Sequence, residues 1–264
     1  MYIRMYTLIF PILTGWLAGW LVNYLADVLP ATRRFSQPAC PKCGKPFRWR
    51  DYLALRKCQG CGQPRGMRSW LVQILALAAS MYLWLYPPKG LGYGLGVILL
   101  IYLAVVLLID LEHRLILHPV SLFGALLGLG VGVLVHGVRQ TFTGGLAGLG
   151  IMLIFYLFGL LFTRLRARRM QRAGQAADDE EALGAGDVFL AGILGLMLGW
   201  PLIWFGLLLG ILASGLVSLM IVIGLLATKK YQAMSVFIPL GPYFILSTFF
   251  LVYMPNWISS VVPK

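Results

Sequence analysis

The sequence predicts an all-α polytopic membrane protein with about eight transmembrane helices and one small cytoplasmic loop domain. Three observations predict this class. Of the 264 residues, 59% are hydrophobic and only 12% are charged. The mean hydropathy of +0.83 is too high for a soluble domain of this length. Several apolar runs have about 20 residues, the length that a helix needs to cross the hydrocarbon core of a bilayer.

Eight apolar runs are candidate transmembrane spans. The first run is too long for the core of a signal peptide and no small-x-small cleavage site follows it, so we expect a retained helix. The sixth run is short, and Trp200-Pro201 predicts a tight turn between the sixth and seventh spans. The predicted spans are residues 6–26, 69–86, 93–111, 119–137, 142–163, 186–200, 201–226 and 236–254.

The basic residues predict the orientation of these spans. A net charge of +13 can indicate nucleic-acid binding, but in a membrane protein Lys and Arg gather in cytoplasmic loops. Alternating spans place 18 of the 22 basic residues on one side, ten of them in segment 30–68. Only Arg4, Lys89, Arg139 and Lys264 fall on the other side. We therefore expect segment 30–68 to be cytoplasmic, both termini to face outward, and nucleic acid not to be a partner.

All four cysteines lie in this cytoplasmic segment, as two Cys-x-x-Cys pairs with 14 residues between them: Cys40 with Cys43, and Cys58 with Cys61. Two such pairs predict one tetrahedral Zn²⁺, and four thiolates leave no open coordination position, so the ion would be structural. Disulfides or free thiols are the alternative, and disulfides are disfavoured on the reducing side of the membrane.

Glycines at positions 44 and 62, directly after the two cysteine pairs, permit the tight turns that a metal knuckle needs. A loop of about 40 residues has too small a core to fold alone, and we expect the metal to supply much of its stability.

Two aspartates lie where a long apolar run meets a polar segment, a costly position that makes them functional candidates. Asp110 ends the third predicted span, and Asp187 begins the sixth directly after Gly184 and Gly186. Glycines there allow close backbone approach. Considered alone, each aspartate has a simpler interpretation. Asp110 could be an ordinary charge at the end of a span, and Asp187 could be a plain helix N-cap.

Considered together, Asp110 and Asp187 fall on the same cytoplasmic side and suggest a pair. Like charges about 4 Å apart repel by roughly 4 kcal/mol at an effective dielectric constant of about 20, so one carboxyl of such a pair keeps a proton. The pair then supplies a general base and a general acid without a metal or a covalent nucleophile. A transporter is a competing interpretation, but it favours aspartates near the bilayer midplane and matching halves, and the sequence shows neither.

The ordered set of motifs resembles the type IV prepilin peptidases, membrane aspartic proteases with a GxGD motif. GWLVNYLADVLP (19–30) is similar to the family's N-terminal GxxLNxxxxRLP, and IPLGPY (238–243) to its C-terminal IPFGP. The cysteine pairs match the family's zinc loop, and Asp110 and GAGD (184–187) match its two catalytic aspartates. The resemblance covers nearly the whole chain. GAGD alone is a weak signal, whereas the ordered set is specific.

The resemblance implies cleavage of the basic leader from type IV prepilins or pseudopilins, at the cytoplasmic face of the bacterial inner membrane. Asp110 and Asp187 would be catalytic, with Gly184 and Gly186 supporting the second aspartate. Many members also methylate the new N-terminus with S-adenosylmethionine. We expect residues 1–92 to form N-terminal helices with the zinc loop, and residues 93–264 the peptidase. The alternative within the enzyme class is a GxGD protease with another substrate, which could lack the cysteines.

The chain departs from the family's pattern at four places. Phe189 stands where the family has Lys after the second aspartate, and Leu117-His118 where it has Pro-Asp after the first. Val28 replaces the Arg of the N-terminal motif, and Gln73 a Glu after the zinc loop. The first two departures bear on substrate positioning and the last two on methylation.

Two further stretches have a simpler interpretation. Residues 164–183 run from basic to acidic and read as a solvated loop, although the acidic DDEE (178–181) could also steer a basic leader by charge. GLAGLG (145–150) and GILASG (210–215) carry small residues that allow close helix packing.

Overall fold

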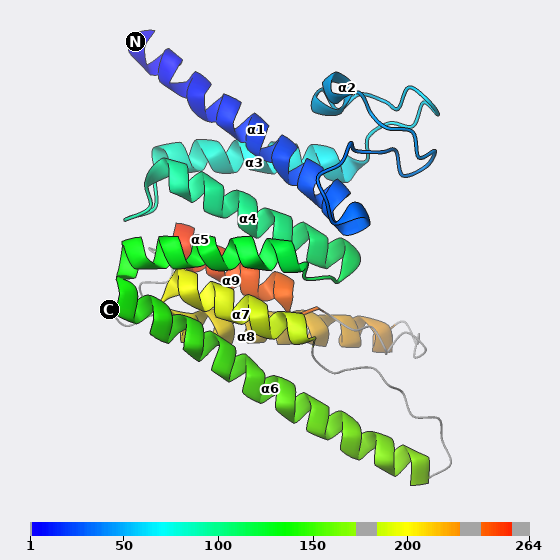
Figure 1. Cartoon of the computed structure of the whole chain (residues 1–264), viewed down its shortest axis with the longest axis vertical. Coiled ribbons are helices and arrows are strands. Elements are labelled where there is room, and N and C mark those ends of the chain that lie inside the picture. The colour runs from blue at the N-terminus through cyan, green and yellow to red at the C-terminus, as the bar shows by residue number, and fades with distance from the viewer. Residues whose placement is uncertain (1, 173–183, 228–238, 255–264) are drawn as a thin grey trace. The chain divides into compact units, whose positions relative to one another are not determined.

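The computed structural model describes residues 2–172, 184–227 and 239–254. Its regular secondary structure within these ranges consists of helices joined by loops. In chain order the helices are α1 (Tyr2–Thr32), α2 (Trp49–Leu53), α3 (Met67–Leu85), α4 (Gly92–His113), α5 (His118–His136), α6 (Val138–Arg172), α7 (Ala185–Leu198), α8 (Leu202–Ala227) and α9 (Gly241–Tyr253) (Figure 1). Their contacts divide the chain into two compact units, Met1–Leu117 and His118–Lys264.

Six of the described helices (α1, α3, α4, α5, α6 and α8) are long and apolar enough to cross a membrane, and α7 and α9 are shorter apolar helices. The eight predicted spans are thereby confirmed as helices, and the chain is a multi-pass membrane protein. Helix α2 is the ninth described helix and belongs to the cysteine-containing loop.

Helix α6 is longer than the sequence predicts. It continues to Arg172, past the expected end at residue 163, because residues 164–172 contain no Gly or Pro and are rich in strong helix formers such as Leu, Arg, Ala and Met. The interpretation of this basic stretch as a loop is therefore wrong. The acidic residues 178–181 lie outside the described residues.

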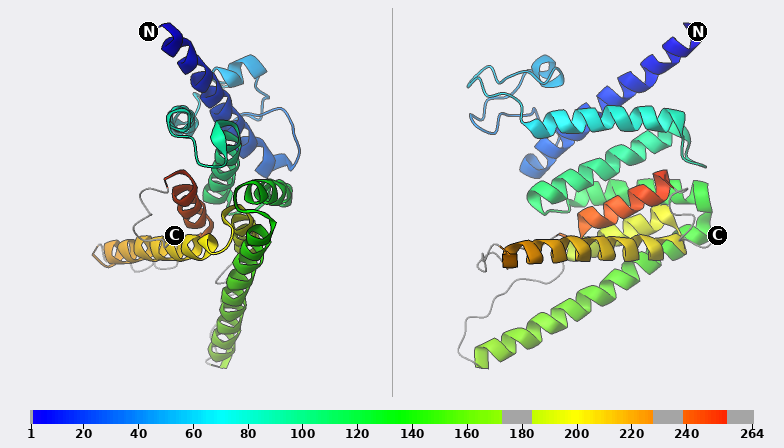
Figure 2. Two further views of the ribbon diagram at one scale, coloured as in Figure 1. Left: turned by 90° about the vertical axis from the view of Figure 1, so that its left-hand side faces the viewer. Right: turned by 180° about the vertical axis from the view of Figure 1, so that it is seen from behind.

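In the first unit, α1 packs against both α3 and α4 (Figures 1 and 2). Three hydrogen bonds link α1 to α3, and in each a side chain of one helix donates to a backbone carbonyl of the other. They are Asn23 Nδ2 to Ser69 O (3.1 Å), Gln73 Nε2 to Trp16 O (2.7 Å) and Ser80 Oγ to Pro11 O (2.7 Å). Such bonds satisfy polar groups where no water can. Gln73 donates here through its amide, which the carboxylate of the family's Glu cannot do.

In the second unit, the short helix α7 packs against α5, α6, α8 and α9, and most of its side chains are buried. Figures 1 and 2 show the start of α6 lying along α7 and its later turns running away from it. Gly199, with φ +68°, ends α7, and α8 begins at Leu202 after Trp200-Pro201. The predicted tight turn is confirmed.

Glycines let α6 and α7 approach to backbone contact. A Cβ built on Gly148 would lie 2.3 Å from the Ala191 carbonyl oxygen, and one on Gly195 would lie 2.3 Å from the Gly144 carbonyl oxygen. Real Cβ atoms do not approach that closely, so only glycine fits. The packing role predicted for residues 145–150 is confirmed at Gly148, whereas a Cβ on Gly150 would meet open space among the described residues.

Adding one methyl group to this contact tests it. Gly148→Ala should destabilise the protein by about 1–3 kcal/mol, because the Ala191 backbone must move to accept the Cβ. Gly150→Ala is the matched control on the same helix, and it should be neutral or slightly stabilising because Ala is the better helix former. Thermal unfolding of the two variants in detergent makes the comparison. Equal stability of the two would contradict the close approach.

Candidate active site and metal centre

The two cysteine knuckles fold alike. In the first, the Cys40 amide donates to Lys45 O (2.9 Å) and the Gly44 amide to Cys40 O (2.8 Å), and the second repeats both bonds around Cys58. Gly44 and Gly62 have φ of +69° and +68°, a backbone conformation that strongly favours glycine. The predicted role of these glycines in tight turns is confirmed.

The knuckles bring the four sulfur atoms together, all within 4.8 Å of one another. The Sγ atoms of Cys40 and Cys61 are 3.7 Å apart, and those of Cys43 and Cys58 are 3.6 Å apart. Zinc–sulfur bonds of about 2.3 Å in a tetrahedron separate neighbouring sulfurs by about 3.8 Å. All four cysteines are free rather than disulfide-bonded. The cluster therefore fits one tetrahedral Zn²⁺ in both its chemistry and its spacing.

The thiols differ in their affinity for protons. Backbone amides of Cys61 and Gly60 lower the pKa of Cys58 to about 6. The Lys45 amide lowers the pKa of Cys43, but desolvation and the neighbouring thiols outweigh it and raise that pKa to about 11. The cluster without metal therefore combines thiolate with thiol, and a bound cation would displace the remaining protons.

The loop shares its core with helix α1. The buried side chains of one cluster come from both parts: Tyr24, Val28, Cys40, Phe47, Tyr52 and Cys58. Trp20, Leu21 and Leu25 of α1 pack against this cluster. Part of the apolar surface that a loop of this size lacks thus comes from the membrane helix.

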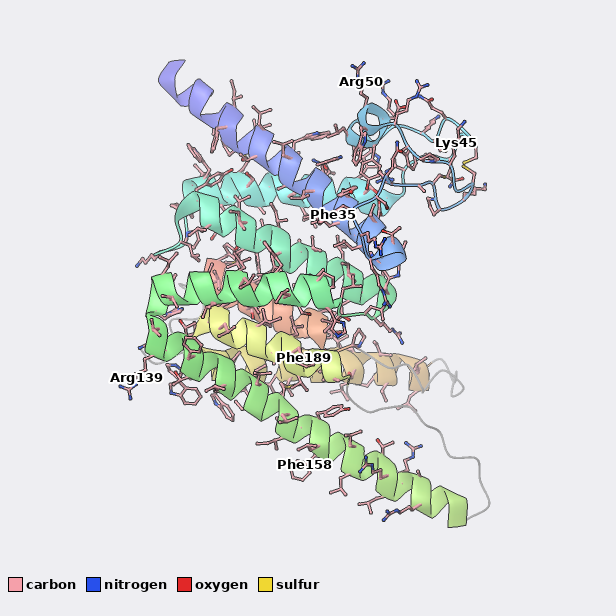
Figure 3. The ribbon with its side chains drawn as sticks, in the orientation of Figure 1. Phe35, Lys45, Arg50, Arg139, Phe158 and Phe189 are labelled. Carbon is pink, nitrogen blue, oxygen red and sulfur yellow. The ribbon has the colours of Figure 1, made fainter. Side chains whose placement is uncertain are left out.

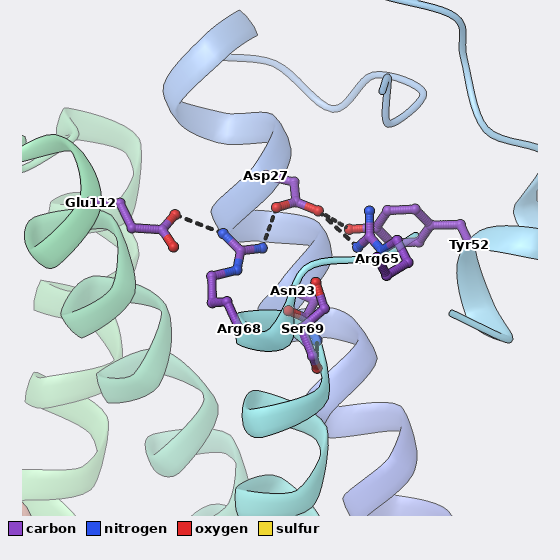
Figure 4. Close-up of polar contacts among 7 residues, drawn as sticks. All are labelled: Asn23, Asp27, Tyr52, Arg65, Arg68, Ser69 and Glu112. Atoms are coloured by element: carbon purple, nitrogen blue, oxygen red, sulfur yellow. Dashed lines mark hydrogen bonds and ion pairs between the residues drawn. The ribbon is translucent and has the colours of Figure 1, made fainter. Parts of the chain in front are cut away.

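A charged cluster lies beside this shared core (Figure 4). Asp27 of α1 accepts hydrogen bonds from the Tyr52 hydroxyl (2.5 Å) and from Arg65 Nη2 (3.1 Å), and it also pairs with Arg68. The other guanidinium nitrogen of Arg68, Nη1, donates to Glu112 Oε2 of α4 (2.6 Å). The cluster therefore links the loop, α1, α3 and α4.

The charges of this cluster balance, since two arginines face two carboxylates. The Arg65 guanidinium also lies over the Tyr52 ring, 4.3 Å from its centroid, and only 8% of the Arg65 side chain is exposed. These residues were not singled out from the sequence. The available signal was Asp27 itself, an acidic residue next to the end of an apolar run, which needs a partner.

Asp110 lies in the last turn of α4. The helix ends because Arg114 adopts a left-handed backbone (φ 52°), and the Arg114 amide donates to the Asp110 carbonyl (2.9 Å). The Asp110 carboxyl is buried, and its Oδ2 has no hydrogen-bond partner within the described ranges. A buried carboxyl oxygen without a partner requires an explanation, and a catalytic role is one of those that apply.

Asp187 lies in the first turn of α7 and is half-buried. Gly184, with extended backbone, is the N-cap of this helix, and the Asp187 amide donates to its carbonyl (3.1 Å). The interpretation of Asp187 as a plain N-cap is therefore wrong. A Cβ on Gly184 would lie 3.9 Å from Asp187 Oδ2, an ordinary van der Waals distance, so the space beside the carboxylate does not by itself require glycine.

An apolar groove of 420 Å³ is lined in part by Phe189, two residues after Asp187. The side chain of Phe189 is 62% exposed, and Figure 3 labels it near the start of α7. The groove lies between α5, α6 and α7 and is lined almost wholly by apolar side chains. Its lining suits an apolar helix or an acyl chain.

The structure thus brings the four predicted metal ligands together. The two aspartates belong to different compact units, and their pairing stays a prediction, as do the supporting roles of Gly184 and Gly186. The division into residues 1–92 and 93–264 also stays a prediction.

The sequence model of the type IV leader peptidase family matches residues 97–255. The chain is similar to proteins named prepilin leader peptidase/N-methyltransferase. It is 28% identical to the one from Myxococcus xanthus (strain DK1622) over 200 residues, which are 72% of this chain and 54% of that protein. It is 32% identical to the one from Burkholderia pseudomallei (strain 1026b) over 237 residues, which are 82% of this chain and 67% of that protein. No solved structure matches the chain.

Removing one sulfur tests the metal site. Cys40→Ser should lose the bound zinc and lower Tm by at least about 5 °C, because the small loop core then stands without its crosslink. Metal content by mass spectrometry and thermal unfolding in detergent measure the two effects. Lys57→Ser, an exposed residue next to Cys58, is the control and should keep both. A zinc-free Cys40→Ser protein of unchanged Tm would contradict the structural role.

Proposed function

Because the chain belongs to the type IV leader peptidase family, we propose that it is an aspartic endopeptidase of the bacterial inner membrane. Its proposed substrates are type IV prepilins or pseudopilins, from which it removes the basic leader. The observation that carries the proposal is the family match over residues 97–255, which includes both Asp110 and Asp187. The names of the relatives support the substrate class.

In the proposed reaction one carboxyl group acts as a general base and the other as a general acid. The ionised carboxylate takes a proton from water as the water oxygen attacks the scissile carbonyl carbon. The protonated carboxyl donates to the carbonyl oxygen and so stabilises the tetrahedral intermediate. The C–N bond then breaks, a proton passes to the leaving nitrogen, and the products are a leader with a new carboxylate and a pilin with a new amine.

The positions of the two aspartates on their helices support a division of these roles. Asp187 lies in the first turn of α7, at the positive end of the helix dipole, which favours a carboxylate. Asp110 lies in the last turn of α4, at the negative end, which favours the neutral acid. We therefore assign Asp187 as the general base and Asp110 as the general acid.

Charge and apolar surface support the proposed cleavage side and substrate path. The basic residues of segment 30–68 favour the cytoplasmic face for the end of α3 that bears Arg68, and Arg68 pairs with Glu112 at the end of α4 that bears Asp110. The apolar lining of the groove, which includes Phe189, suits the apolar helix that follows the leader in a prepilin. A phenylalanine in the lining of this groove is compatible with an apolar helix, whereas the family's Lys would add a charge.

Neutral isosteres of the aspartates test the dyad. Asp110→Asn and Asp187→Asn should each lower the cleavage rate by a factor of about 100 or more, because each removes the general acid or base. A prepilin with an intact leader, followed by mass measurement of its products, gives the rate. Unchanged zinc content and Tm show that the variants are folded. Substantial cleavage by either folded variant would falsify the dyad.

N-methylation of the new amine with S-adenosylmethionine is a second candidate activity, favoured by the names of the relatives. Two motif positions serve packing here instead: Val28 is buried, and the Gln73 amide is engaged by Trp16 O. We therefore expect only a minor methylated fraction when cleavage is run with an isotopically labelled methyl donor. Mass measurement of the product's N-terminus decides, and complete methylation would show that neither departure matters.

A further inference from the structure

We propose that Arg68 is a positioning residue for Asp110: it bridges Asp27 of α1 and Glu112 of α4 and so fixes the last turn of α4. The proposal rests on the proposed function, since it gives Arg68 a task only if Asp110 takes part in cleavage. Arg68 would touch neither substrate nor reacting atoms. It would act through Glu112, which lies two residues after Asp110 on the same helix.

The bridge uses both ends of one guanidinium. Nη1 of Arg68 donates to Glu112 Oε2 (2.6 Å), and Nη2 pairs with Asp27 Oδ1. A guanidinium holds its donors in a fixed planar fork, so two carboxylates bound to one arginine are held at a set separation. An ammonium group is a compact point charge and would not impose this geometry.

The other side of the bridge is itself held. The second oxygen of Asp27 accepts from Tyr52 and Arg65, and the Tyr52 side chain is fully buried in the core that the loop shares with α1. One residue after Arg68, the Ser69 carbonyl accepts from Asn23 of α1. Figure 4 shows these contacts running from the loop through α1 and α3 to α4. The anchor is therefore stiffer than an isolated surface ion pair.

The last turn of α4 needs such an anchor. Helix ends fray, and α4 stops three residues after Asp110. Within the described part of the chain, the contact with Arg68 is the only ion pair that α4 makes. The partial burial of Arg68 and Glu112, with side chains 28% and 31% exposed, also protects the pair from screening by salt.

Removing either side of the bridge tests the inference in the full-length, zinc-loaded protein. Arg68→Gln and Glu112→Gln should each lower kcat for prepilin cleavage by about 10- to 100-fold, the cost of a misplacement near 1 Å. KM should stay within about twofold, because no substrate contact is lost. Zinc content should not change.

A double-mutant cycle distinguishes positioning from general damage. If both residues act through one contact, the double variant Arg68→Gln with Glu112→Gln should be no slower than either single variant. Arg68→Lys should fall between wild type and Arg68→Gln, because it keeps the charge but not the fork. Arg56→Gln is the matched control: Arg56 pairs with Asp51 inside the loop (3.7 Å) and should leave kcat unchanged.

Several results would overturn the proposal. These are a normal kcat for Arg68→Gln, multiplicative losses in the double variant, a rise in KM alone, or loss of methylation with normal cleavage. If Arg68→Gln does not fold, Glu112→Gln still decides, because it leaves the Asp27 pairs in place.

Failure of the proposed function would give a different result: Asp110→Asn would then cleave normally. An inactive Asp110→Asn beside a fully active Glu112→Gln would remove this inference alone.

Discussion

The arrangement of the loop and helices in the first unit depends on neutralising one carboxylate, that of Asp27. Asp27 follows an apolar run of α1, where an unpaired charge would cost several kcal/mol. It is compensated by Tyr52, Arg65 and Arg68, which come from the loop and from the start of α3. These partners can reach Asp27 only if the loop folds back onto α1 and α3 begins beside it. Arg65 and Arg68 follow Asp27 by 38 and 41 residues. The need to neutralise one carboxylate thus constrains the path of the roughly 40 residues between them.

The cysteine loop is consequently attached to the membrane helices in two ways. An apolar cluster joins Tyr24 and Val28 of α1 to side chains of the loop, and the Asp27 pairs lie next to it. A domain of this size buries too little apolar surface to be stable alone. The apolar surface that α1 contributes makes up part of this shortfall, and a metal ion held by the four cysteines would make up more of it from within the loop.

Features that depend on short spacings could be predicted from the sequence. The four cysteines and the glycines after them form their knuckles through bonds a few residues long, and the spans follow from hydropathy. The extent of α6 could not be predicted, because helix propensity continued the helix where polarity suggested a loop. The ion pairs of Asp27 could not be predicted for a different reason. Which arginine contacts which carboxylate depends on how the helices pack, and the sequence alone does not give that packing. The pairing of Asp110 with Asp187 is a prediction of the same long-range kind, drawn from topology and resemblance.

The two aspartates are held by different kinds of force. Asp187 begins a short helix whose backbone contacts α6 through Gly148 and Gly195, and close packing of this kind varies little with pH or salt. Asp110 ends a helix whose described ion pair is with Arg68, and Arg68 in turn pairs with Asp27, which Tyr52 and Arg65 also hold. A network of charged and hydrogen-bonded groups of this kind depends on the ionisation of its carboxylates, which close backbone packing does not. The end of α4 is therefore the part of the proposed site whose position depends on electrostatics.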